Sequence, residues 1–191
     1  MARVKWSNDL LDIYYKMRPK MGSGDLMEFA SHGFIGNAIR FFTKKDVNHT
    51  AIVWHVDEFK RVRDRKFIME ALDFGIELNL MSCRLKEYKG DVYWYPLKEE
   101  YHHLRDEVAS ICLLAEGRTD EIRYDYLSLF RNMWTKVSVD VKKNSFCSEF
   151  AQWALQGAKI LSPPLEKALR PGEFDNLGIY HPRIKIYSWK G

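Results

Sequence analysis

The chain has 191 residues, of which 46% are hydrophobic and 14% aromatic, enough for one folded domain with a substantial core. Its formal net charge is only +4, so charge alone does not support a nucleic-acid-binding protein, and no nucleic-acid partner is expected. Three widely spaced cysteines without a C-x-x-C pair argue against a disulfide framework or a structural zinc site, and we expect no metal or other cofactor.

The first residues lack the apolar core of a signal peptide, and no apolar run approaches the ~18 residues needed to span a bilayer. The sequence therefore predicts no transmembrane segment and a cytoplasmic location. Signal-free export and a virion location are left open as alternatives.

In chain order, the pattern predicts a helical arm over residues 1–21 and a core over residues 22–191, which together form a single domain, 1–191. Period-two or β-branched runs predict strands at 26–30, 49–54, 67–72, 76–80, 91–95 and 184–189. Helical spacing predicts helices at 33–43, 99–116, 124–134 and 146–157. We expect an α+β fold in which an antiparallel meander of four or five strands packs against these helices.

Cys147 lies at the start of the last predicted helix, which directly follows a polar stretch that ends in Asn144 and Ser145. Asn144 or Ser145 can cap that helix, which places Cys147 at its second or third position. Free backbone N–H groups and the helix dipole favour a thiolate there, and the same N–H groups can bind an oxyanion. The small residues Ala151 and Ala154 lie on the same side of this helix as Cys147, and they form with it a stripe of small side chains. Such a stripe lets the helix approach a sheet closely. The alternative is a buried packing thiol.

His49 opens a predicted strand, and Ala51 and Val53 share its face. The small side chain of Ala51 permits a helix to come close to the histidine. The alternative is an ordinary strand-end histidine, and His32 and His55 are rival candidates for the same thiol.

Glu70 is the one carboxylate in an otherwise apolar strand, and burial of its charge requires a partner such as an imidazole. The alternative is a glutamate on the solvent face of that strand. His49 and Glu70 are 21 positions apart, which suffices for a strand, a loop and a returning strand, so the two can be neighbours. A thiol at a helix start, a histidine and a carboxylate form the nucleophile, base and orienting group of covalent catalysis.

Several short motifs occur in an order that resembles the circularly permuted papain-like enzymes of the NlpC/P60 superfamily, in particular the YiiX/YebB-like group. They are Gly24-Asp25-Leu26, Asn48-His49-Thr50, Phe67 to Leu72, Tyr124-Asp125-Tyr126, Phe146 to Phe150 and Arg170 to Phe174. The resemblance extends from about residue 22 to 178. It implies a permuted papain-like fold with an antiparallel sheet of about five strands.

By this resemblance, Cys147 is the nucleophile, His49 the general base and Glu70 the third member. The resemblance also places Tyr124 near the active site, where its hydroxyl can assist the oxyanion. Ser148, beside the nucleophile, is a second candidate for an oxyanion or substrate contact. The expected activity is that of a thiol hydrolase that cleaves an amide or ester in a peptidoglycan peptide, an acyl-lipid or another small amide.

Two alternatives keep the same scaffold: an acyltransferase with the same cysteine, histidine and glutamate, and a non-catalytic interaction or virion protein. The segment 60–66 carries five basic residues within seven positions, namely Lys60, Arg61, Arg63, Arg65 and Lys66. It is interpreted as a solvated hairpin end. The more specific interpretation is that this segment contacts an anionic partner or an acidic substrate.

Overall fold

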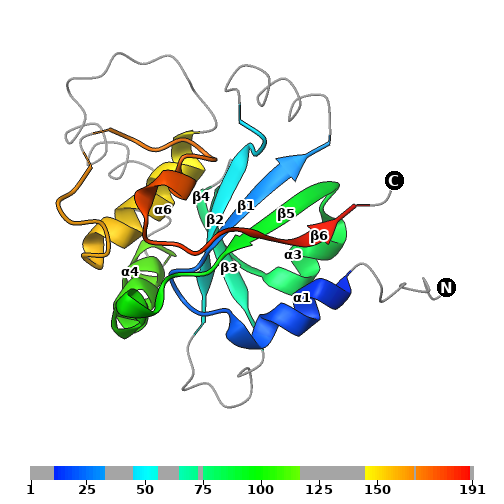
Figure 1. The fold of residues 1–191 in the computed structure, drawn as a ribbon, viewed down its shortest axis with the longest axis horizontal. Coiled ribbons are helices and arrows are strands. Elements are labelled where there is room, and N and C mark those ends of the chain that lie inside the picture. The colour runs from blue at the N-terminus through cyan, green and yellow to red at the C-terminus, as the bar shows by residue number, and fades with distance from the viewer. Residues whose placement is uncertain are drawn as a thin grey trace, which may run out of the picture.

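The fold is built on a six-stranded sheet in which every neighbouring pair of strands is antiparallel (Figure 1). The computed structural model describes residues 11–32, 45–55, 65–72, 75–116, 145–165 and 167–189. The strands are β1 Leu26–Ser31, β2 His49–Trp54, β3 Phe67–Leu72, β4 Gly75–Leu80, β5 Gly90–Tyr95 and β6 Ile184–Ser188. The α+β class and the positions of the predicted strands are confirmed.

The strand order, β4-β3-β2-β1-β5-β6, departs from the predicted meander. Strands β1 to β4 do follow one another as a meander, but β5 returns to the free edge of β1 and pairs with it from Leu26↔Tyr95 to Ser31↔Gly90. The helix α3, Met81–Glu87, intervenes between β4 and β5. A tight turn at this point would have kept the two strands adjacent, and the intervening helix lets the chain return to the other side of β1.

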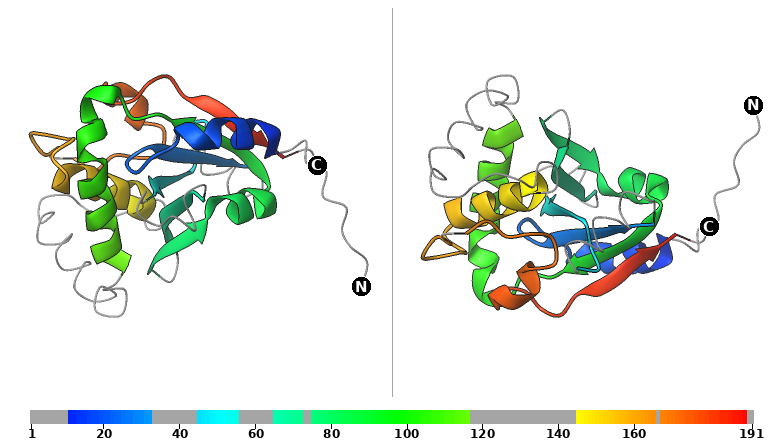
Figure 2. Two further views of the ribbon diagram at one scale, coloured as in Figure 1. Left: turned by 90° about the horizontal axis from the view of Figure 1, so that it is seen from below. Right: turned by 90° about the horizontal axis from the view of Figure 1, so that it is seen from above.

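Helices cover both faces of the sheet (Figure 2). On one face, α4 and α6 pack over an apolar cluster that includes Ile52, Trp54 and Met69. On the other face, α1 and α3 pack over a cluster that includes Ala51 and Ile68. The helices are α1 Asp12–Met17, α3, α4 Arg105–Glu116 and α6 Ser145–Gly157, with 3-10 turns at Arg18–Lys20, Glu99–Leu104 and Phe174–Leu177. None of the described helices is long and apolar enough to cross a membrane.

Three of the predicted helices are confirmed. The N-terminal arm contains α1, which ends in a 3-10 turn that includes Pro19. The helix predicted at 99–116 begins as a 3-10 helix and continues as α4, and the one predicted at 146–157 is α6. The helices predicted at 33–43 and 124–134 lie outside the described residues.

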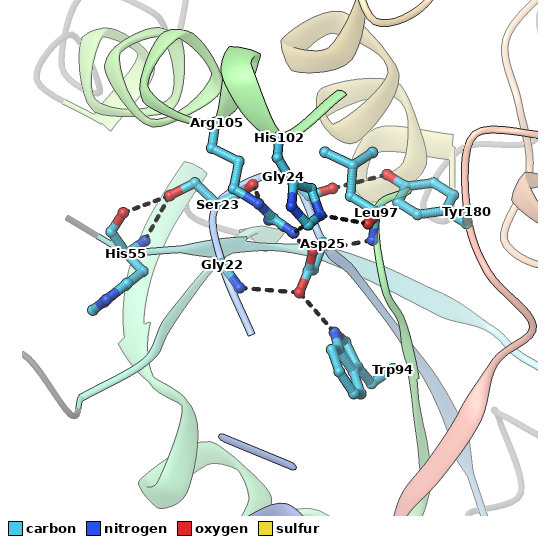
Figure 3. A network of polar contacts seen from close by, with 10 residues as sticks. All are labelled: Gly22, Ser23, Gly24, Asp25, His55, Trp94, Leu97, His102, Arg105 and Tyr180. Atoms are coloured by element: carbon cyan, nitrogen blue, oxygen red, sulfur yellow. Dashed lines mark hydrogen bonds and ion pairs between the residues drawn. The ribbon is translucent and has the colours of Figure 1, made fainter. Parts of the chain in front are cut away.

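A buried carboxylate fastens α4 to one end of the sheet (Figure 3). Asp25, just before β1, accepts hydrogen bonds from the backbone N–H groups of Gly22 and Leu97 and from the Trp94 indole, at 2.9–3.1 Å. The Arg105 guanidinium reaches the same carboxylate at 2.8 Å from the start of α4. A Cβ on Gly22 would lie 2.7 Å from that guanidinium, so a larger residue there would require the Arg105 side chain to shift.

Candidate active site

His49 is held at the first position of β2. The backbone N–H of Asn48 donates to the carbonyl of Phe29 at 2.8 Å, and the Asn48 amide oxygen accepts from the N–H of Ser31 at 2.7 Å. In the β1–β2 register His49 lies opposite Phe29, and the two rings are 5.5 Å apart. These contacts fix the histidine at the end of the sheet opposite to Asp25.

Glu70 lies beside His49 on the adjacent strand. The β2–β3 register pairs Val53 with Ile68, and its continuation puts Glu70 opposite Ala51, on the same face as His49. The Nε2 atom of His49 is 2.8 Å from a carboxylate oxygen of Glu70. The glutamate is fully buried, at 0% exposure. The predicted cross-strand contact is therefore confirmed, and the alternative of a solvent-facing glutamate is wrong.

Cys147 is the third residue of α6, as the capping pattern predicts. Its side chain is hydrogen-bonded to the imidazole of His49. The cysteine is 3% exposed, whereas the His49 side chain is 16% exposed, so solvent reaches the pair from the imidazole side. Ala151 and Ala154 of the small-residue stripe are fully buried against the sheet.

The role predicted for Ala51 is wrong. Ala51 belongs to the face covered by α1 and α3, while α6 packs on the opposite face, against Ile52 and its neighbours. Ala51 therefore does not make room for the helix that carries Cys147. His49 is the first residue of β2, so its side chain is not enclosed on both sides by neighbours on the same face. We infer that the thiol and the imidazole meet there, at the end of the sheet.

The charges around His49 act against the effect of its burial. Burial lowers the pKa of the imidazole, but the adjacent Cys147 and Glu70 outweigh it and raise the pKa to about 9. Burial also raises the pKa of Glu70, yet its contacts with His49 and Arg84 hold that pKa below its usual value. The imidazolium form of His49 is thus stabilised by both Cys147 and Glu70.

Two further residues bind Glu70, and the sequence analysis missed both. The Arg84 guanidinium, from α3, donates through Nε to Oε1 at 2.8 Å and through Nη2 to Oε2 at 3.4 Å. The Asn79 amide, from β4, donates to Oε1 at 3.2 Å. The signal that could have found them is the requirement for partners around a carboxylate in an apolar strand.

The remaining predicted site residues are placed as follows. Ser148 is fully buried, and its hydroxyl donates to the carbonyl of Leu169 at 2.6 Å, which ties α6 to the segment 167–170. Tyr124 lies outside the described residues, as do Lys60, Arg61 and Arg63 of the basic segment. Arg65 is exposed, but Lys66 is only 5% exposed and so does not belong to a basic surface.

The rival histidines lie elsewhere. His55 follows the opposite end of β2, where its backbone binds the Ser23 hydroxyl (Figure 3). His32 lies 3.9 Å from Asp91. Across the part of the chain that the structure describes, no group of three or more histidine, cysteine, aspartate or glutamate side chains could hold a metal ion.

The comparisons with known proteins found a similarity among solved structures. A scan against protein-family models gave no match, and a search of curated proteins gave none either. Among solved structures, the chain is similar to the crystal structure of metalloprotein YiiX from Escherichia coli O157:H7, with a TM-score of 0.49 and 15% sequence identity. The match covers 90% of this chain and 99% of that one. Similarity at this level carries no inference about activity or bound metal in this chain.

Proposed function

We propose that this protein is a thiol hydrolase that cleaves an amide or ester bond through an acyl-enzyme intermediate on Cys147. The observation that supports the proposal is the contact of His49 with both Cys147 and Glu70. A packing thiol has no need of an imidazole that is also held by a buried carboxylate. The arrangement instead matches a nucleophile, its base and the group that orients the base.

In the first half of the proposed reaction, His49 accepts the thiol proton and the sulfur of Cys147 attacks the carbonyl carbon of the substrate. The carbonyl electrons move to oxygen, and backbone N–H groups in the first turn of α6 donate to that oxyanion. When the oxyanion collapses, the bond to the amine or alcohol breaks, and the leaving group takes the proton from His49. A thioester on Cys147 remains.

In the second half, His49 removes a proton from water, and the hydroxide so formed attacks the thioester carbon. The sulfur leaves, the acid is released, and the proton on His49 restores the starting pair. Glu70 remains ionised throughout, because its pKa is held low. Its role is to orient the imidazole and to stabilise the imidazolium.

Hydrolysis of a panel of chromogenic acyl esters and acyl anilides tests the proposal. We expect Cys147→Ala to reduce kcat/KM by at least about 10³-fold, because the nucleophile is removed. Cys83→Ala and Cys112→Ala are the matched controls and should retain activity. Cys83 is exposed and Cys112 is fully buried, where burial raises the pKa of its thiol to about 12. Equal rates for Cys147→Ala and wild type would contradict the assignment.

An acyltransferase is the second candidate. Transfer to an acceptor requires that water be kept from the thioester, and the 3% exposure of Cys147 is consistent with this requirement. A labelled acyl donor separates the two reactions. Label found only in free acid, with amine and alcohol acceptors present, would exclude transfer to those acceptors.

A further inference from the structure

Arg84 is held in place from two directions. Its guanidinium carbon lies 5.6 Å from the ring centre of Phe29 and 5.4 Å from that of Tyr88, distances typical of cation–π contacts. Its Nε and Nη2 atoms reach the two oxygens of Glu70. The Arg84 side chain is 25% exposed. An arginine that rests on two rings and binds both oxygens of a buried carboxylate has little freedom to move.

Phe29 connects Arg84 to the imidazole. The same ring that lies next to the guanidinium packs against His49, its partner in the β1–β2 register. Glu70 therefore lies between two cationic groups, the guanidinium and the imidazole, which share contacts with one aromatic side chain.

The charged groups that face Glu70 come from each neighbouring element. His49 approaches from β2, Arg84 from α3, and Glu77 lies directly opposite on β4. Cys147, from α6, contacts the imidazole of His49. Asn79 donates both to Glu70, at 3.2 Å, and to Glu77, at 3.4 Å. Burial disfavours the ionised form of Glu70, and Arg84 supplies a permanent positive charge that opposes this effect.

Building on the proposed function, we propose that Arg84 is a positioning residue for the reaction: it keeps Glu70 ionised and aimed at His49. Arg84, Glu70, His49 and Cys147 then form a row of alternating charges, positive, negative, positive and negative, when the thiol has lost its proton. This row is neutral as a whole. Removal of the guanidinium leaves one excess negative charge, and uptake of a proton is the simplest way to remove it.

The charge and the geometry of Arg84 can be separated by two substitutions. Arg84→Gln removes the charge, so every group in the row binds protons more tightly. Arg84→Lys keeps the charge but loses the two-point contact with the carboxylate. We therefore expect Arg84→Gln to displace the pH profile of Cys147 reactivity upwards by on the order of one pH unit. Arg84→Lys should reduce the rate with little displacement of the profile.

The experiment measures alkylation of Cys147 by iodoacetamide, followed by intact-protein mass spectrometry from pH 5 to 10 in a Cys83→Ser background. At pH 7 we expect Arg84→Gln to slow alkylation about 10-fold, the usual effect of losing a partner that orients a reactive group. Lys86→Gln, which removes a positive charge from an exposed position on the same helix, is the matched control and should have no effect. Circular dichroism checks that each variant is folded.

A double-mutant cycle with Glu70→Gln tests whether Arg84 acts through Glu70. If it does, Arg84→Gln should change the alkylation rate less than about two-fold once Glu70 is already glutamine. An equal effect of Arg84→Gln in both backgrounds, or an unmoved profile in the folded Arg84→Gln variant, would overturn the proposal. The assay uses no substrate, so this result is independent of the hydrolysis panel. Loss of ester cleavage alone would count against the proposed function and not against the role of Arg84.

Discussion

At the scale of single residues, the central feature is an imidazole between two groups that favour its protonated form. Burial alone would lower the pKa of His49, and the pKa of about 9 follows because Cys147 and Glu70 outweigh burial. Each of the two can be removed separately, and each removal should lower that pKa. The pH dependence of activity should therefore change when either Cys147 or Glu70 is replaced.

Glu70→Gln should move the alkaline limb of the hydrolysis profile downwards from about pH 9, by about one to two pH units, because one favourable charge next to the imidazolium is lost. The rate at pH 7 should fall about 10- to 100-fold. Glu99→Gln is the matched control: Glu99 lies 2.9 Å from His181, but both side chains are exposed. An alkaline limb that stays in place in Glu70→Gln would contradict the account.

At the scale of elements, the strands were predictable and one short helix was not. The strand runs carry period-two or β-branched patterns over five or six residues, and their register then brings His49 next to Glu70. Helix α3 has only seven residues, with Met81 and Leu85 as its buried positions, which is too short for helical periodicity to be recognised. Arg84 was missed for that reason.

The assignment of sheet faces also required the structure. Alternation along β2 tells which residues share a face, but it does not tell which helix covers that face. The sequence analysis therefore gave Ala51 to the wrong helix, although Ala151 and Ala154 of α6 were recognised as residues that allow close approach.

The packing of α6 on the sheet should control the contact between Cys147 and His49. Ala154→Leu adds three carbons at a position with 0% exposure, which should cost about 1–3 kcal/mol of unfolding free energy and push the helix away from the sheet. The rate of Cys147 alkylation should fall with it. Ser110→Leu, the same kind of enlargement at an exposed position of α4, should change the unfolding free energy by less than about 0.5 kcal/mol. Unchanged alkylation in a destabilised Ala154→Leu variant would contradict the prediction that the packing of α6 controls the reactivity of Cys147.

At the scale of the whole molecule, the buried carboxylate networks of Asp25 and Glu70 lie at opposite ends of the sheet. Asp25 joins β1 to the start of α4, and Glu70 joins β3 to α3 and to the thiol–imidazole pair. His55, which binds Ser23 in the first network, lies six positions from His49, a separation of about 20 Å along an extended strand. The first network should therefore matter for stability and the second for reactivity.

Asp25→Ala should lower the free energy of unfolding by about 3–5 kcal/mol, because it removes the carboxylate that compensates the charge of the largely buried Arg105. Urea unfolding followed by fluorescence measures this change. The hydrolysis rate per folded molecule should remain within about two-fold of wild type, since additivity holds for distant sites. A displaced pH profile in Asp25→Ala would show that the two ends of the sheet are coupled, which the account does not allow.

The most direct test is an NMR titration of the His49 imidazole in the wild-type protein and in Cys147→Ala. The account predicts that His49 titrates near pH 9 in the wild type and at a clearly lower pH when the sulfur is removed. Titration of His49 near its ordinary value of about 6.5 in both proteins would show that the thiol and the imidazole do not interact, and would contradict the account.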